Sequence, residues 1–160
     1  MGCGKSSVGR KLSELLCCSF MDLDEVIEQQ TGRTVPEIFA TDGEAAFRQM
    51  ELEVLERVLK PSTAVISLGG GTVTQERCAE MVKENTLCIY LRTSVDTLVE
   101  RLTDEAAGRP LLASDSDLRT RIEDLMSKRA SIYESTAHHI IDTDGLTIEA
   151  LSQLISRIVV

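Results

Sequence analysis

The first residues of the chain have the types and the spacing of a phosphate-binding loop. Gly4, Lys5 and Ser6 match the closing half of the pattern G-x-x-x-x-G-K-[ST]. In this pattern small residues let backbone N–H groups converge on phosphate oxygens, the lysine reaches the β- and γ-phosphates, and the hydroxyl is a hard oxygen ligand for Mg²⁺. Apolar residues at helical spacing follow, and the dipole of a helix starting here would strengthen an anion site. We therefore predict that Gly2–Ser7 bind nucleotide phosphates.

The N-terminal part of this phosphate-loop pattern is incomplete. It requires a glycine two residues ahead of Met1 and a buried strand before that glycine, and neither is in the sequence. Burying four apolar side chains of a central strand stabilises a domain by about 6–12 kcal/mol. We therefore expect the 160-residue chain to be unstable or aggregation-prone and to have little activity without such a strand.

Composition is typical of one soluble globular domain over residues 1–160. The chain is 42% hydrophobic and 27% charged, and its formal net charge of -9 argues against nucleic acid as a general partner. It contains no apolar run of membrane-spanning length and no signal peptide. Its five cysteines are an odd number without metal-site spacing, which indicates reduced thiols in a cytosol-like compartment. We expect a cytoplasmic monomer that binds neither nucleic acid nor membrane.

Helical and strand patterns alternate along the chain, which predicts an α/β fold with a parallel sheet covered by helices on both faces. The predicted helices are 5–16, 24–30, 34–39, 44–59, 75–83, 94–102, 118–133 and 147–158. The predicted strands are 19–22, 64–68, 86–91 and 139–142. Asp24, Thr34, Ser94 and Thr147 are the predicted N-caps of four of these helices.

Two of the predicted strands end in residues that could act on a ligand, since ligands bind at the carboxyl ends of strands in open α/β sheets. Asp22 and Asp24 follow the first strand, where they could act on a phosphate-bound metal and on a substrate hydroxyl. Alternatively, one caps a helix and the other is solvated. Three consecutive glycines, Gly69–Gly71, follow the second strand and remove every side chain where backbone must approach a ligand.

Three arginines could bind an anionic substrate or phosphate. Arg48 and Arg129 lie on predicted helices and together could grip a carboxylate through bidentate hydrogen bonds. Arg109 lies in the polar stretch 104–117, which has no helical or strand periodicity and could be a mobile lid that orders when nucleotide binds. Alternatively, the aliphatic parts of Arg48 and Arg129 pack on the protein while their guanidinium groups reach water. The alternative for Arg109 is a solvated loop cation.

Together these segments resemble the shikimate kinase family, in order, over essentially the whole chain. The matching segments are Gly2–Ser7, Phe20–Asp24, Thr31–Phe39, Gly43–Glu51, Ser67–Gly71, Arg109–Leu112 and Lys128–Tyr133. The resemblance implies a P-loop kinase fold with strand order 2-3-1-4-5, of which strand 1 would be absent here. It also implies transfer of the ATP γ-phosphoryl group to the 3-hydroxyl of shikimate, a step of chorismate and aromatic amino acid biosynthesis, with Mg²⁺ as cofactor.

The resemblance further implies a role for each matching residue. For ATP it implies contacts from Gly2, Cys3, Gly4, Lys5, Ser6, Ser7, Arg101, Arg109 and Asp144. For shikimate it implies contacts from Asp24, Arg48, Gly69, Gly70, Gly71 and Arg129. For Mg²⁺ it implies Ser6 and Asp22. Catalysis would depend on Asp24 in the position of a base, with Lys5 and Arg109 neutralising phosphate charge.

Two other functions remain open from the sequence. A related small-molecule kinase, such as gluconate kinase, shares the phosphate loop, although Gly69–Gly71 and the aspartate pair with Arg48 disfavour it. A catalytically impaired kinase-like module is favoured by the incomplete N-terminal part of the phosphate loop. The presence of four predicted site residues argues against it: Asp24, Arg48, Arg109 and Arg129.

Overall fold

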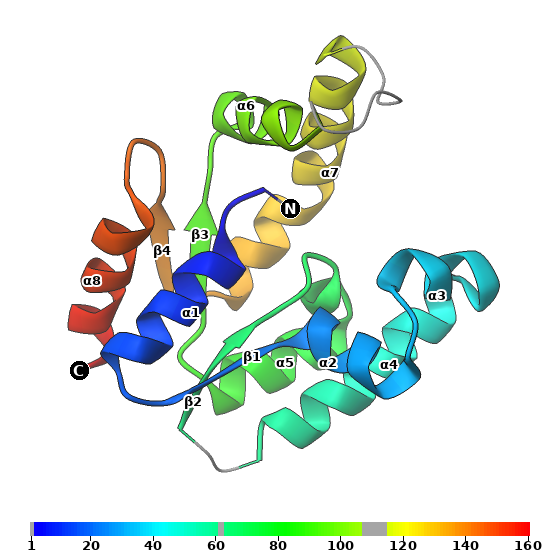
Figure 1. The fold of residues 1–160 in the computed structure, drawn as a ribbon, viewed down its shortest axis with the longest axis horizontal. Helices are drawn as coiled ribbons and strands as arrows, with labels where there is room; N and C mark the ends of the chain where they lie inside the picture. The colour runs from blue at the N-terminus through cyan, green and yellow to red at the C-terminus, as the bar shows by residue number, and fades with distance from the viewer. Residues whose placement is uncertain (1, 61–62, 107–114) are drawn as a thin grey trace.

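A computed structural model describes residues 2–60, 63–106 and 115–160 of the chain. Its elements, in order, are α1 (Lys5–Leu15), β1 (Ser19–Asp22), α2 (Leu23–Thr31), α3 (Val35–Thr41), α4 (Gly43–Val58), β2 (Ala64–Ser67), the 3₁₀ helix η1 (Thr72–Thr74), α5 (Glu76–Asn85), β3 (Ile89–Arg92), α6 (Val95–Ala106), α7 (Asp115–Thr136), β4 (His139–Asp142) and α8 (Ile148–Val159). Figure 1 shows this alternation of short strands and helices, which confirms the predicted α/β class.

The strands of the described chain form two separate parallel pairs. β1 pairs with β2, with Ser19 opposite Ala64, and β3 pairs with β4, with Ile89 opposite His139. The alternation of elements predicts parallel strands but not their order. The observed pairs are the pairs 2-3 and 4-5 that remain when strand 1 is absent from the order implied by the family resemblance. α1 packs against β1, β2 and α8 (Figure 1).

Three apolar clusters hold the helices in place. The first joins α1, β4 and α8 and contains Val8, Leu12, Ile141, Leu151 and Ile155. The second joins α2, α3 and α4 and contains Leu23, Ile27, Ile38, Phe47 and Val54. The third joins α4, η1 and α5, with Tyr133 and Ile132 of α7 packed against it, and contains Leu55, Val73, Cys78 and Val82. The second and third clusters share α4, so they fix the position of this helix relative to η1 and α7.

The helix N-termini follow the predicted capping residues, with one exception. Thr34 accepts a hydrogen bond from the Glu37 N–H in a capping box, and Thr147 accepts one from the Ala150 N–H. The prediction that Asp24 caps α2 is wrong. The cap is Asp22, whose Oδ1 accepts from the Asp24 N–H at 3.1 Å. Asp22 has extended backbone angles, and α2 begins at the next residue, so Asp24 already lies in the first helical turn. The predicted cap Ser94 also accepts a hydrogen bond, from the Thr97 N–H.

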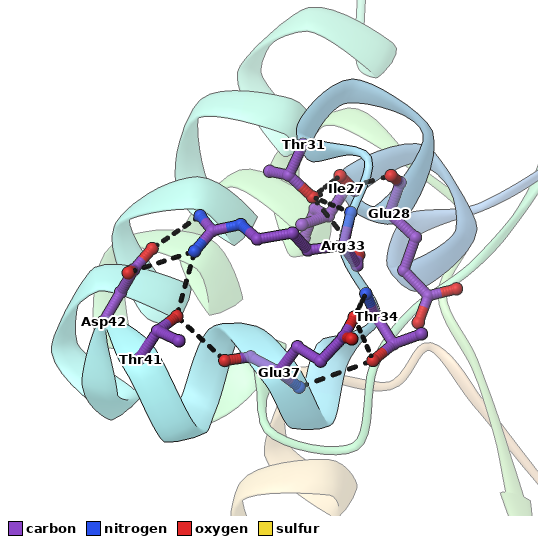
Figure 2. A network of polar contacts seen from close by, with 8 residues as sticks. All are labelled: Ile27, Glu28, Thr31, Arg33, Thr34, Glu37, Thr41 and Asp42. Atoms are coloured by element: carbon purple, nitrogen blue, oxygen red, sulfur yellow. Dashed lines mark hydrogen bonds and ion pairs between the residues drawn. The ribbon is translucent and has the colours of Figure 1, made fainter.

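Polar contacts hold α3 at both of its ends (Figure 2). Before α3, the Glu28 side chain accepts from the Val35 N–H at 2.8 Å. After α3, Asp42 accepts two hydrogen bonds from the Arg33 guanidinium, at 3.1 and 2.6 Å. The same guanidinium donates to Thr41 Oγ1 at 2.9 Å. These contacts join the α2–α3 turn to the start of α4, the helix that carries Arg48.

The predicted loop 104–117 is partly helical. α6 extends to Ala106 and α7 begins at Asp115, so both ends of the stretch belong to helices. Helices extend beyond an apolar pattern where the next residues have adequate helix propensity, as Glu105 and Ala106 do. The remainder, 107–114, lies outside the described residues and includes Arg109.

All five cysteines are free thiols, as their spacing predicts. In the part of the chain that the structure describes, no helix has both the length and the apolar character needed to cross a bilayer.

Candidate functional site

The predicted phosphate loop forms an open helix N-terminus. Gly2 and Gly4 have φ angles of 66° and 76°, in the left-handed region that favours glycine. Gly4 is the N-cap of α1, and no side chain caps this helix. The first N–H groups of α1 therefore have no intrahelical or capping partner, which leaves them available to an anion.

The two predicted metal ligands lie in direct contact. The Ser6 hydroxyl, in the first turn of α1, donates to Asp22 Oδ2 at 2.6 Å, and Ser67 Oγ lies 3.3 Å from the same hydroxyl. Three elements therefore place hard oxygen atoms together, which is the ligand type that Mg²⁺ prefers. Among the described residues, no three His, Cys, Asp or Glu side chains converge on a metal position. Mg²⁺ commonly takes one or two protein carboxylates together with substrate phosphates, so this small donor set fits it.

Asp24 has a buried oxygen with no partner in the described protein. Its Oδ1 atom makes no hydrogen bond, and burial of the carboxyl raises the pKa of Asp24 above its ordinary value. The Asp22 and Glu51 carboxylates raise this pKa further, whereas the positive charge of Lys5 lowers it. Buried carboxylate oxygens are normally hydrogen-bonded, so the unsatisfied Oδ1 is suited to a hydroxyl donor from a ligand. The raised pKa also makes Asp24 a stronger base than an exposed aspartate.

The glycine loop lies against these groups. A Cβ on Gly69 would come within 2.9 Å of both Asp24 Oδ1 and Glu51 Oε1. A Cβ on Gly71 would collide with the guanidinium of Arg48. These glycines therefore let the loop backbone approach the protein's own side chains closely, and their predicted approach to a ligand stays a prediction. Gly69 therefore lies beside Asp24, and Gly71, two residues further along the loop, lies beside Arg48.

Arg48 is held by two carboxylates. Its Nη1 donates to Glu51 Oε2 at 2.5 Å and its Nη2 to Glu44 Oε1 at 3.0 Å. Glu51 is fully buried, and its other oxygen accepts from Thr72 Oγ1 at 2.6 Å. The prediction assigned no role to Glu51. Its position three residues after Arg48 in a helix was a usable signal, because residues three apart on a helix are neighbours.

Tyr133 of α7 reaches the glycine loop, and Arg129 lies one helical turn before it on the same helix. They are four residues apart, so they lie on the same side of the helix. Tyr133 Oη donates to the Gly70 carbonyl at 2.5 Å. Arg129 is partly buried and makes no ion pair or hydrogen bond with any other residue in the described ranges. An unpaired arginine at this position is available to an anionic ligand.

Arg101 and Asp144, two of the predicted ATP contacts, lie near one another, and Arg101 reaches the phosphate loop. Arg101 Nη1 donates to the Gly2 carbonyl at 3.3 Å. Asp144 Oδ1 accepts from the Ser94 N–H at 3.2 Å, and this hydrogen-bonding with Ser94 lowers the pKa of Asp144. The charge of Arg101 lowers it slightly further. The structure thus brings Ser6 to Asp22, Gly69 to Asp24, Gly71 to Arg48 and Arg101 to Gly2. Arg109 lies outside the described residues.

The comparisons agree with this geometry. The family model described as "Shikimate kinase" matches residues 1–159. A curated shikimate kinase of Acinetobacter baylyi is 39% identical over 159 residues, which cover 99% of this chain and 87% of the relative. One from Salinibacter ruber is 37% identical over 162 residues, covering 97% of this chain and 79% of the relative. The predicted absence of a first strand is not tested by these matches and stays a prediction.

Solved structures give the same result. The structure described as "Shikimate kinase from Acinetobacter baumannii in complex with shikimate" has a TM-score of 0.89 and 36% identity, and the match covers 99% of this chain and 88% of that one. A shikimate kinase structure from Bacteroides thetaiotaomicron has a TM-score of 0.91 and 31% identity, with 99% and 93% coverage. The family match over nearly the whole chain, the curated relatives and these structures lead to one conclusion: the chain belongs to the shikimate kinase family.

Proposed function

We propose that this protein transfers the γ-phosphoryl group of ATP to the 3-hydroxyl of shikimate, giving shikimate 3-phosphate and ADP. The observation that carries the proposal is the buried, unpartnered Oδ1 of Asp24 beside the glycine loop. A ring hydroxyl would satisfy this oxygen and would be held next to the base that accepts its proton. The raised pKa of Asp24 suits this role, since a base is most effective when its pKa approaches the working pH.

The carboxylate of the substrate would be bound by two arginines and the glycine loop. Arg48 lies against Gly71, and Arg129 has no competing partner among the described residues. The Gly70 and Gly71 N–H groups can add hydrogen bonds, because neither residue has a side chain of its own to cover its backbone. Gly69 brings the loop close to Asp24. A carboxylate held at the arginines would place the ring between them and Asp24, which orients one hydroxyl for transfer.

ATP would bind at the open N-terminus of α1. Gly2, Cys3, Gly4, Lys5, Ser6 and Ser7 supply its backbone and side-chain contacts. Ser6 and Asp22 would hold Mg²⁺, which when bound neutralises charge on the β- and γ-phosphates. Lys5 neutralises further charge, and Arg109 has the same role by the family resemblance alone. Arg101, which donates to the Gly2 carbonyl, and Asp144, which lies near Arg101, would contact adenine.

The proposal includes the organisation of the chain. We infer one domain over residues 1–160, with the stretch 104–117 as its lid, acting as a monomer in the cytoplasm. The family's place in aromatic amino acid biosynthesis supports the location.

The test is a coupled assay of ADP release with shikimate and, as a control, with gluconate. We expect Mg²⁺-dependent turnover with shikimate and none with gluconate. Turnover of gluconate would indicate the other small-molecule kinase. Calorimetry that detects shikimate binding without any turnover would instead indicate a kinase-like binding module.

A further inference from the structure

Tyr133 connects α7 directly to the glycine loop. Its hydroxyl donates to the Gly70 carbonyl at 2.5 Å, between residues 63 positions apart in the chain. The ring is fixed independently of this hydrogen bond. It packs against the apolar cluster of α4, η1 and α5, and its centroid lies 5.2 Å from that of Tyr90 on β3. The hydroxyl therefore points to one place on the loop, set by packing on the ring.

This hydrogen bond determines which way the next amide points. No peptide bond of the described chain is cis, so the carbonyl of Gly70 and the N–H of Gly71 point in opposite directions. Because Tyr133 holds the carbonyl on its own side, the Gly71 N–H is directed away from α7. No residue in the described ranges accepts a hydrogen bond from this N–H.

The freed amide lies beside Arg48. The Arg48 guanidinium occupies the space next to the Gly71 Cα atom, so the amide and the guanidinium can act on one ligand group. Two adjacent glycines have wide conformational freedom, and without an anchor this peptide plane can rotate. A rotated plane would present the Gly70 carbonyl, which repels a carboxylate, in place of the amide donor.

We propose that Tyr133 is a positioning residue for substrate recognition, which orients the Gly70–Gly71 peptide so that the Gly71 N–H donates to the substrate carboxylate. This inference rests on the proposed function, in which the glycine loop binds that carboxylate. Tyr133 itself does not touch the substrate. Its contribution is therefore to the affinity for a carboxylate and not to phosphate binding.

The test compares Tyr133→Phe with Tyr90→Phe. Both variants remove one hydroxyl from the same ring pair, but the Tyr90 hydroxyl makes no hydrogen bond with any described residue. We expect Tyr133→Phe to raise the KM for shikimate about five- to tenfold, as the loss of one hydrogen bond predicts, with the KM for ATP unchanged. Tyr90→Phe should leave both values unchanged. Equal effects of the two variants on KM for shikimate would overturn the inference.

A substrate analogue separates positioning from a loss of fold stability. In the analogue, a hydroxymethyl group replaces the carboxylate of shikimate. We expect Tyr133→Phe to leave the KM for this analogue unchanged, because the analogue has no carboxylate for the Gly71 N–H to bind. An equal increase in KM for shikimate and for the analogue would show that Tyr133 acts only on the stability of the fold. If the wild-type protein does not bind shikimate, the proposed function is wrong. If the wild-type protein binds shikimate but Tyr133→Phe has no effect, only the inference about Tyr133 is wrong.

Discussion

The guanidinium of Arg48 occupies the space that a side chain on Gly71 would need. The two residues come from α4 and from the loop after β2, and the buried carboxylate of Glu51 holds the guanidinium there. In the proposed function, substrate recognition therefore depends on a backbone position without a side chain and on an arginine whose orientation is fixed before the ligand arrives. Such preorganisation reduces the entropy lost on binding.

Gly71→Ala should weaken shikimate binding by displacing Arg48. The φ of Gly71 is -98°, which alanine adopts without strain, so the effect isolates the collision between the added methyl group and the guanidinium. We expect roughly a ten- to hundredfold loss of affinity, corresponding to hydrogen bonds with a charged group, and no change for ATP. Titration calorimetry with each ligand measures both. Normal shikimate affinity would show that Arg48 has room to move without losing function.

Arg48→Lys and Arg129→Lys should each weaken shikimate binding while ATP binding is retained. Lysine keeps the charge but loses the planar fork that binds a carboxylate through two hydrogen bonds. Arg33→Lys is the control, because Arg33 makes the same kind of bidentate contact with Asp42, away from the glycine loop. If both site variants bind shikimate as well as the control does, the carboxylate is held elsewhere.

Glu51→Gln should both destabilise the protein and weaken shikimate binding. The variant removes the buried partner of Arg48, and losing a hydrogen bond to a charged group costs roughly 1.5–3 kcal/mol. Glu44→Gln is a matched control, because Glu44 pairs with the same guanidinium from an exposed position, where ion pairs contribute little. Chemical denaturation and shikimate titration of both variants test this. Equal stability of the two variants would contradict the role of the buried carboxylate.

Asp24→Asn should reduce kcat by about 10²–10⁴-fold, the typical contribution of a general base. The KM for ATP should change little, because Asp24 acts on the acceptor hydroxyl. Glu25→Gln, at the next position of α2, is the control, since Glu25 is exposed and pairs with Arg10. Steady-state kinetics give the result. A kcat of Asp24→Asn within threefold of wild type would remove Asp24 from the chemistry.

The raised pKa of Asp24 predicts two pH effects. Activity requires the ionised carboxylate, so kcat should rise with pH through a midpoint above the ordinary aspartate pKa of about 3.9. Stability should move in the opposite direction, because a group whose pKa is raised by folding loses its stabilising contribution as pH rises through the folded-state value. The melting temperature of Asp24→Asn relative to wild type should therefore be higher at pH 7 than at pH 4. A difference that does not depend on pH would mean that the pKa is not raised.

Local signals in the sequence predicted much of the fold and part of the site. The capping box of Thr34 and Glu37, the cap at Thr147 and the loop glycines Gly2 and Gly4 each depend on residues within about four positions. Patterns of this range can be read from the chain, because the backbone groups concerned have no distant partner. The family resemblance added residue roles that spacing alone left open, such as a carboxylate contact for Arg129.

The tertiary structure decided the relationships between distant segments. It buried Glu51 against Arg48 and Thr72, and it joined Tyr133 to Gly70. Glutamate and tyrosine in a helix are compatible with solvent exposure as well as burial, so their types do not reveal a partner. The Tyr133 contact exists because α7 packs on the cluster of α4, η1 and α5, a packing that depends on side chains from four elements at once. For that reason the pattern of α7 taken alone predicts a helix, whereas the orientation of the glycine loop follows only from the packed chain.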